Sequence, residues 1–272
     1  MFSVLISVYS KDDAEFFYVA LDSLRKQTVL PNEVVLVCDG PLTGELYDVI
    51  DKFQILFDEI DVDFVVLKKS LNEGLGLSLK YGSEFCTQSY IMRMDSDDIS
   101  RPNRIELSEM YLRSYPDVDV LGGLIEEFDS IPGDLKRTRK VPLCNKDIYK
   151  FGKHRNPMNH VSVCIKRDSL IAVGNYESVI SHEDYYLWSK FLVNGFKLKN
   201  VNDCFVDVRV GNDLIGRRKG FSYFNLECYF ASKCYNLGYF SLYDCFSYLF
   251  PRLIMRVFPS FILKKIYILL RK

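Results

Sequence analysis

Closely spaced cysteine pairs are absent from this sequence of 272 residues, and histidines number only three. The ligand pattern of a structural zinc site is therefore missing. Eight cysteines are spread singly along the chain, which favours reduced thiols buried as small apolar side chains. Charge of one sign is not in excess either, because the net charge is −1, and this gives no global reason to expect nucleic acid as a partner.

Long uninterrupted apolar runs are missing as well. Residues 1–9 lack the basic segment and the long apolar segment of a secretion signal. The most apolar stretch, residues 246–270, is not expected to span a membrane, because it is interrupted by Pro251, Arg252, Arg256, Pro259, Lys264 and Lys265. We therefore expect a cytoplasmic protein that is at most attached to a membrane surface.

Short apolar runs alternate with longer amphipathic ones in the first half of the chain, which is typical of an α/β fold with a mostly parallel sheet. The patterns predict buried strands at residues 4–9, 34–38, 64–67 and 90–94, and helices at 14–27, 44–57 and 74–87. For the second half they predict helices at 103–115 and 183–193, strands at 118–121, 161–165 and 197–201, and a loop over the site at 130–157.

An acidic cluster, Asp95-Ser96-Asp97-Asp98, directly follows the fourth predicted strand. In such sheets ligands bind beyond the carboxyl ends of the strands. Carboxylates there can hold Mg²⁺ or Mn²⁺, ions that prefer one or two protein carboxylates together with phosphate oxygens and water. The alternative is that Asp97 or Asp98 merely caps the next helix.

A second pair of acids, Glu183 and Asp184, opens a predicted helix whose apolar face would anchor it on the core. One interpretation is a general base that takes a proton from an acceptor hydroxyl. The other is a favourable interaction with the helix dipole.

Histidine and arginine side chains supply further candidates. His160 precedes a predicted strand and could be a ligand, a phosphate contact or a structural histidine. Arg209, Arg217 and Arg218 could reach a diphosphate through bidentate bonds or could form a solvated basic loop.

Two enzyme classes lack their defining pattern here. The glycines at 74, 76 and 82 do not have the G-x-G-x-x-G spacing, which a Rossmann oxidoreductase would carry after the first strand. A phosphohydrolase of the haloacid dehalogenase type would place a D-x-D motif after the first strand, whereas here it follows the fourth.

No acidic residue follows Asp244, so the C-terminus is basic. Apolar residues recur at helical spacing from Phe246 onward, while Arg252, Arg256 and Lys264 lie on the other face. This pattern indicates an amphipathic helix on an anionic membrane surface. The alternative is a C-terminal helix packed on its own domain.

Taken together, these residues resemble glycosyltransferase family 2, the GT-A class of inverting enzymes, and within it the branch that builds bacterial O-antigen and capsular repeat units. The resemblance extends over about residues 2–222 and is carried by residues 4–9, 34–40, 72–76, 93–99, 155–160, 183–188 and 217–218. It implies a Rossmann-like GT-A domain at 1–222, with a nucleotide-sugar half at 1–100 and an acceptor half at 101–222. A helical, basic and amphipathic tail would follow at 223–272.

The resemblance also implies roles for single residues. Asp184 would be the catalytic base, and Asp97 would hold the metal under the diphosphate. The nucleotide would be held by Tyr9 and Asp39 at the base, by Asp95 at the ribose or the metal, and by Arg217 and Arg218. Possible acceptor or phosphate contacts are Glu183, His160 and Trp188. The sequence departs from the usual family pattern at Ser7, Ser10, Cys38 and Lys80.

The implied reaction is a single in-line displacement that needs Mn²⁺ or Mg²⁺ and no protein acid. A hexose would pass from a UDP-sugar, with UDP-galactose as the first choice and UDP-glucose as the alternative, to a sugar on undecaprenyl diphosphate, forming a β-glycosidic bond. The protein would lie at the inner face of the bacterial cell membrane. A non-catalytic membrane-surface protein on the same scaffold would be expected to have lost Asp97 or Asp184, and both are present.

Overall fold

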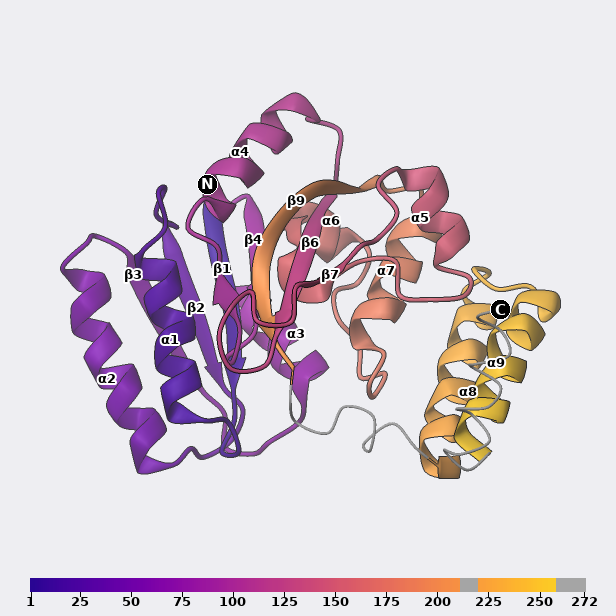
Figure 1. Cartoon of the computed structure of the whole chain (residues 1–272), viewed down its shortest axis with the longest axis horizontal. Helices are drawn as coiled ribbons and strands as arrows, with labels where there is room; N and C mark the ends of the chain where they lie inside the picture. Colours follow the sequence, from indigo (N-terminus) through magenta and orange to yellow (C-terminus); the bar gives the residue numbers. More distant parts are fainter. Residues whose placement is uncertain (211–219, 258–272) are drawn as a thin grey trace.

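A computed structural model describes residues 1–210 and 220–257 of the chain. Within these residues, nine strands form one mixed sheet, and eight of them follow the order β3-β2-β1-β4-β8-β6-β9-β5 while β7 pairs with β6 (Figure 1). The strands are β1 Phe2–Val8, β2 Glu33–Cys38, β3 Asp63–Lys68, β4 Tyr90–Met94, β5 Ile99–Ser100, β6 Val120–Phe128, β7 Arg137–Arg139, β8 Cys164–Lys166 and β9 Leu198–Arg209.

Strands β1 to β4 pair in parallel, whereas β8 is antiparallel to both β4 and β6. Helices cover both faces of this sheet. They are α1 Ala14–Arg25, α2 Gly44–Asp58, α3 Leu75–Phe85, α4 Arg104–Ser114, α5 Asn145–Phe151, α6 Arg167–Ala172, α7 Glu183–Val193, α8 Gly220–Asn236 and α9 Leu242–Val257. The predicted α/β fold with a mostly parallel, helix-flanked sheet and helices at the C-terminus is confirmed.

The alternation of side chains along β1 explains why the sheet needs helices on both faces. Val4 and Ile6 point into one core with α1 and α2, while Leu5 points into the other with α3 and α7. All three side chains are at most 1% exposed. Full burial of a Val, Leu or Ile side chain contributes about 1.5–3 kcal/mol, so the two cores hold the strand in register from both sides.

The predictions for the second half of the chain were less accurate. The stretch 130–157 is not a loop throughout, since it contains β7 and α5, and β9 runs for 12 residues rather than five. Strand β6 was predicted too short because its two glycines, Gly122 and Gly123, break its apolar pattern. A Cβ on Gly123 would lie 2.5 Å from the Phe205 ring, so glycine is what lets the two strands approach.

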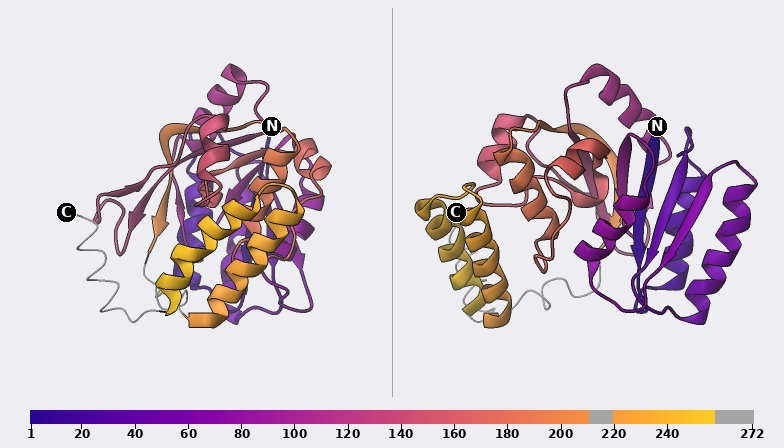
Figure 2. Two further views of the ribbon diagram at one scale, coloured as in Figure 1. Left: turned by 90° about the vertical axis from the view of Figure 1, so that its right-hand side faces the viewer. Right: turned by 180° about the vertical axis from the view of Figure 1, so that it is seen from behind.

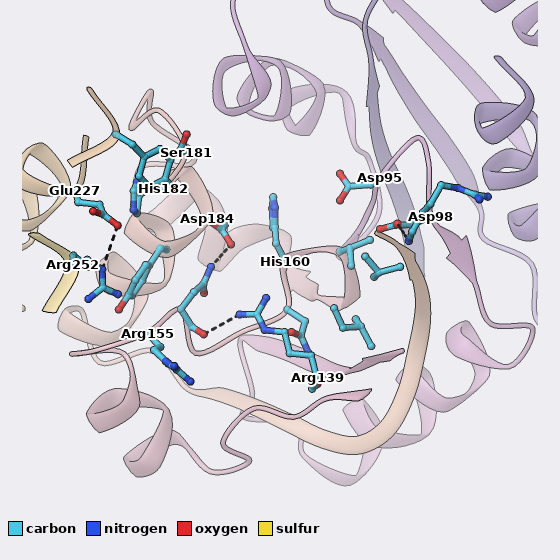
Figure 3. A pocket seen from close by; sticks show the side chains of 18 of the residues that line it. Asp95, Asp98, Arg139, Arg155, His160, Ser181, His182, Asp184, Glu227 and Arg252 are labelled. Carbon is cyan, nitrogen blue, oxygen red and sulfur yellow. Dashed lines mark hydrogen bonds and ion pairs between the residues drawn. The ribbon is translucent and has the colours of Figure 1, made fainter. Parts of the chain in front are cut away.

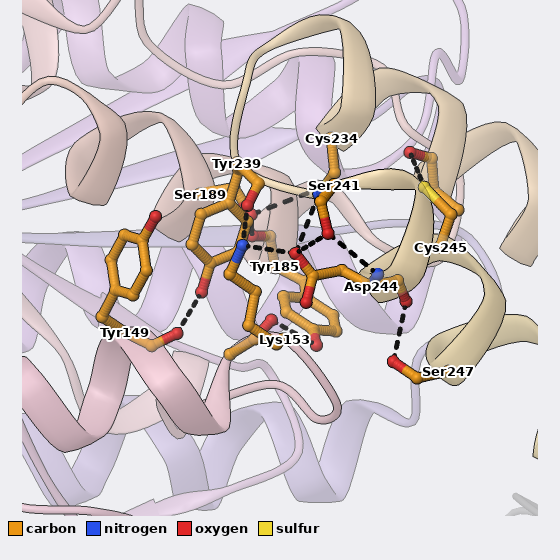
Figure 4. A network of polar contacts seen from close by, with 12 residues as sticks. Tyr149, Lys153, Tyr185, Ser189, Cys234, Tyr239, Ser241, Asp244, Cys245 and Ser247 are labelled. Carbon is orange, nitrogen blue, oxygen red and sulfur yellow. Dashed lines mark hydrogen bonds and ion pairs between the residues drawn. The ribbon is translucent and has the colours of Figure 1, made fainter.

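Helices α8 and α9 lie side by side at one end of the molecule and pack against α7 (Figure 2). The predicted domain boundary at 222/223 falls in the first turn of α8. Lys153 ties the start of α9 to the main body, because its ammonium donates to the Asp244 carboxylate at 2.9 Å and to the Tyr239 carbonyl oxygen (Figure 4). Among the described residues, every helix is too short or too polar to cross a membrane.

Candidate active site

A cavity of about 620 Å³ opens between the carboxyl end of β4, the end of β9, the start of α7 and the pair α8–α9. Figure 3 shows Asp95 and Asp98 at one side, Asp184 and His160 in the middle, and Glu227 with Arg252 at the far side. Asp95, Asp97 and Asp98, which follow β4, and Asp184 of α7 are far apart along the chain and line one cavity.

The acidic cluster after β4 is crowded with negative charge. Asp98 is 2% exposed and accepts a hydrogen bond from the Arg209 backbone N–H at 2.9 Å. Burial, and repulsion from Asp95 and Asp12, raise the pKa of Asp97 to about 6. Neither Asp97 nor Asp98 caps the next helix, since the N-terminal cap position of α4 is Asn103.

Two arginines partly offset that charge. Arg93 is 1% exposed and donates to Asp95, while its Nε and Nη1 atoms have no hydrogen-bond partner among the described residues. Arg209 donates from Nε to the Asp97 carbonyl oxygen at 3.3 Å, and its guanidinium lies over the Phe16 and Phe128 rings. Asp95 and Asp97 line the cavity, and the charge of Asp95 helps to raise the pKa of Asp97. Closely spaced carboxylates of this kind are a donor set suited to a hard divalent cation, so Asp95 and Asp97 fit the metal expected from the sequence.

A second acidic group, which was not predicted from the sequence, lies on strands β6 and β9 of the sheet. The ligand atoms of Glu126, Cys204 and Asp207 lie within 4.8 Å of one another. The Arg101 guanidinium already supplies a cation there, because it contacts Asp207 at 2.7 Å and Glu126 at 2.5 Å. We interpret this group as an ion-pair network whose negative charge Arg101 already balances in part.

Asp184 lies in the first turn of α7 and lines the cavity. Burial raises the pKa of its carboxyl group, although a hydrogen bond donated by Asn156 acts in the opposite direction. Asn156 was not assigned a role from the sequence, although it lies in the segment 155–160 that carries the family resemblance. A carboxylate with a raised pKa and one oriented oxygen suits a general base.

The neighbouring Glu183 does not line the cavity but packs against α3. A Cβ on Gly76 would lie 2.7 Å from Cγ of Glu183 and 2.9 Å from the Glu177 carbonyl oxygen, so a glycine is required for this close approach. Burial raises the pKa of Glu183 as well.

His160 lines the cavity and faces the Tyr176 hydroxyl, with 3.0 Å between Nε2 and Oη. Burial, helped by the charge of Arg93, lowers its pKa well below the usual value, so the imidazole is neutral near pH 7. Trp188 lies behind it and is 0% exposed. The expected contact between Trp188 and the acceptor is therefore wrong, because the ring is fully covered by protein. Trp188 instead packs against the His160 ring.

Tyr9 and Asp39 follow β1 and β2 at the same edge of the sheet as the acidic cluster, outside the lining of this cavity. Tyr9 is 37% exposed. Asp39 accepts hydrogen bonds from the Lys69 ammonium and from the backbone N–H groups of Glu73 and Gly74. Burial alone would raise the pKa of Asp39, but these hydrogen bonds lower it below the usual value. The same bonds fix the loop after β3. Arg217 and Arg218 lie outside the described residues.

Two arginines of the basic face expected on the C-terminal helix, Arg252 and Arg256, point into the cavity. Glu227 of α8 is 2% exposed and lies 2.9 Å from Nη2 of Arg256 and 3.5 Å from Nε of Arg252. Both arginines line the cavity, so the prediction that they face lipid headgroups is wrong. They turn inward because a buried carboxylate without a cationic partner would cost about 3–5 kcal/mol. Lys264 and Lys265 lie outside the described residues.

A mostly parallel sheet with acidic residues at its carboxyl edge and a buried carboxylate across the same cavity defines the GT-A class of glycosyltransferase. The family model described as Glycosyl transferase family 2 matches residues 3–179, and the chain belongs to this family.

Two bacterial relatives match most of the chain. The amylovoran biosynthesis glycosyltransferase AmsE of Erwinia amylovora is 37% identical over 84% of this chain and 83% of its own length. A protein of Escherichia coli named UDP-Gal:alpha-D-GlcNAc-diphosphoundecaprenol beta-1,3-galactosyltransferase is 36% identical over 95% of this chain and 92% of its own length.

Solved structures share the fold at low identity. TarS 1-349 of S. aureus in complex with UDP-GlcNAc has a TM-score of 0.67 and 16% identity, covering 93% of this chain and 72% of that one. This chain spans 43% of the longer TarS chain. Mannosyltransferase PcManGT from Pyrobaculum calidifontis, in complex with GDP-Man and Mn²⁺, has a TM-score of 0.63 and 12% identity, covering 94% of this chain and 70% of that one.

Proposed function

We propose that this glycosyltransferase of polysaccharide synthesis is a metal-dependent, inverting enzyme that moves galactose from UDP-galactose to a sugar on undecaprenyl diphosphate, forming a β-glycosidic bond. The observation that carries the proposal is that Asp95, Asp97 and Asp184 line one cavity. The choice of donor and acceptor is supported by the 36% identical relative whose name specifies UDP-galactose and a diphosphoundecaprenol acceptor.

Asp97 and Asp95 would hold the Mn²⁺ or Mg²⁺ ion, which when bound would neutralise the charge that develops on the departing nucleoside diphosphate. Asp184 takes the proton of the acceptor hydroxyl as the oxygen attacks the anomeric carbon and the bond to UDP breaks on the opposite side. Asn156 holds one oxygen of Asp184 and leaves the other for that proton. The single displacement inverts the anomeric configuration, so an α-linked donor gives a β-linked product.

Other residues at or beyond the carboxyl edge of the sheet would complete the nucleotide site. Tyr9 and Asp39 would hold the base, with Asp39 acting in part through the loop that it fixes. Arg217 and Arg218 would contact the donor diphosphate. In this arrangement residues 1–100 bind the nucleotide, residues 101–222 form the acceptor half, and residues 223–272 form the membrane-associating segment.

An exposed apolar face on α9 supports peripheral binding to the inner face of the cell membrane. Leu242, Tyr243, Phe246 and Phe250 are 72%, 77%, 64% and 51% exposed. The rings of Phe246 and Phe250 stack with their centroids 5.3 Å apart. Aromatic side chains at this exposure bury readily at the boundary of headgroups and acyl chains.

We expect the double substitution Phe246→Ser and Phe250→Ser to lower binding to anionic vesicles at least tenfold, because each buried Phe contributes about 1.5–3 kcal/mol. Vesicle co-sedimentation measures this. Ile55→Ser, at an equally exposed position on α2, serves as the control and should sediment like the wild type. Equal sedimentation of the wild type and the double variant would show that α9 does not dock on lipid.

The proposed reaction is tested by a donor screen with a GlcNAc-diphosphate-lipid acceptor and Mn²⁺. We expect transfer from UDP-galactose at least tenfold faster than from UDP-glucose, and a product that a β-galactosidase cleaves. Faster transfer from UDP-glucose would show that UDP-galactose is the wrong donor assignment. An α-linked product would refute the inverting mechanism.

A further inference from the structure

The wall of the cavity farthest from the acidic cluster is basic. It is formed by Arg155, before the 3₁₀ turn His160–Ser162, and by Arg252 and Arg256 of α9. Arg139 of β7 also lines the cavity, where it donates to the Asn156 carbonyl oxygen at 3.4 Å (Figure 3). The cavity therefore has one acidic end and one basic end, with Asp184 between them.

The two arginines of α9 are held in place by their surroundings. Arg252 donates to the carbonyl oxygens of Tyr248 and His154, each at 2.7 Å, and its guanidinium lies 3.5 Å from the centroid of the Tyr248 ring. Arg256 is fixed by Glu227 and lies over the Tyr223 ring. Because one carboxylate serves both cations, the pair keeps a positive charge.

Arg155 adds a second positive charge. Within the described residues its side chain has no hydrogen bond or ion pair, and it is exposed to the cavity. An arginine fork without a protein partner, beside a fixed guanidinium pair, matches the geometry of a phosphate or diphosphate group.

The position of this wall decides which phosphate it would meet. The donor diphosphate belongs at the acidic end, where Asp95 and Asp97 face the cavity. An acceptor sugar whose hydroxyl reaches Asp184 would extend its own substituent toward the other end. Moreover, Arg252 and Arg256 lie beyond residues 3–179, the part that matches the family model, so two of the three arginines belong to a segment that the common domain does not supply.

We propose that Arg155, Arg252 and Arg256 form a subsite for the diphosphate group of the acceptor, with Glu227 as the positioning residue that orients the two arginines of α9. The inference rests on the proposed function, which supplies a diphosphate-linked acceptor. It adds that the enzyme selects this acceptor by the charge of its linker as well as by its sugar.

The experiment compares two soluble acceptors without any membrane: GlcNAc linked through a diphosphate to a short alkyl chain, and GlcNAc linked to the same chain without phosphate. The wild type should prefer the charged acceptor in kcat/KM by at least a hundredfold. Arg155→Gln should reduce that preference about tenfold through KM, because a charge-assisted hydrogen bond is lost, and Arg155→Lys should restore part of it. The KM for UDP-galactose should stay within twofold.

Arg113→Gln, on the exposed face of α4, is the matched control and should keep the full preference. Glu227→Gln should reduce the preference for the charged acceptor, because Arg252 and Arg256 lose the carboxylate that orients them. A preference that stays unchanged in Arg155→Gln, or a wild type that uses both acceptors equally, overturns the proposal. Because the acceptors form no bilayer, a loss seen only on vesicles would mean that the arginines bind membrane headgroups instead.

A second readout is independent of turnover. Calorimetry should show that the alkyl diphosphate binds the wild type at least tenfold more tightly than it binds Arg155→Gln. If no donor is transferred at all but this difference holds, the proposed reaction fails while the subsite stands. Equal binding to both proteins refutes the subsite even if transfer is observed.

Discussion

Asp184→Asn is expected to lower kcat by about a hundredfold to ten thousandfold, the range that a positioned general base contributes. An amide has nearly the shape of the carboxylate and still accepts the hydrogen bond from Asn156, but it cannot take the proton of the acceptor hydroxyl. The affinity for UDP-galactose should therefore stay close to that of the wild type. Steady-state kinetics together with calorimetry of donor binding measure the two quantities separately.

Glu183→Gln is the matched control, because it removes the adjacent carboxylate, which packs on Gly76 rather than lining the cavity. It should retain most of the activity. If Glu183→Gln loses as much activity as Asp184→Asn, the assignment of the base is wrong. If donor affinity in Asp184→Asn falls in step with kcat, the residue serves binding or folding instead of proton transfer.

The raised pKa of Asp184 gives the same prediction a pH signature. The base accepts a proton only when it is ionised, so kcat should fall as the pH drops through this raised pKa. The acid limb should then lie above the range of an ordinary aspartate. In Asp184→Asn the residual rate should lack this limb.

The sequence was sufficient to predict those strands and helices whose apolar pattern is uninterrupted. The strand from Tyr90 to Met94 has the predicted bounds, and the helix that begins at Glu183 was also predicted over its observed range. Parallel strands bring their carboxyl ends to one edge, so placing Tyr9, Asp39 and Asp97 at the same edge required only the strand assignments.

Features that depend on long-range contacts could not be predicted in this way. Helical spacing placed Arg252 and Arg256 on one face of α9, but it could not show that this face meets a buried carboxylate from α8. The amphipathic pattern has the same period whether a helix packs on protein or on lipid. The helical pattern placed Trp188 on the apolar face of α7, but only the packed structure shows that the ring is fully covered and cannot contact the acceptor.

Asp97→Asn is expected to lower the rate at least a hundredfold and to weaken Mn²⁺ binding in the presence of UDP, because the substitution removes a charged oxygen ligand from the cavity. Excess chelator should abolish transfer by the wild type while circular dichroism stays unchanged. Folding should not suffer in the variant. A carboxyl group whose pKa is raised to about 6 in the folded protein destabilises the fold once it ionises, so this cost is present above that pH and absent well below it. At pH 7.5 without metal, Asp97→Asn should therefore unfold at a temperature no lower than that of the wild type.

Glu126→Gln separates this site from the other acidic group, because Glu126 lies with Cys204 and Asp207 around the Arg101 guanidinium. Its Mn²⁺ affinity should match that of the wild type if the metal binds after β4. A loss of affinity in Glu126→Gln together with normal binding in Asp97→Asn would move the metal to the ion-pair network. Full turnover in excess chelator would show that the reaction does not need a metal. Arg93 and Arg209 would then be the cations beside the acidic cluster that stabilise the donor diphosphate.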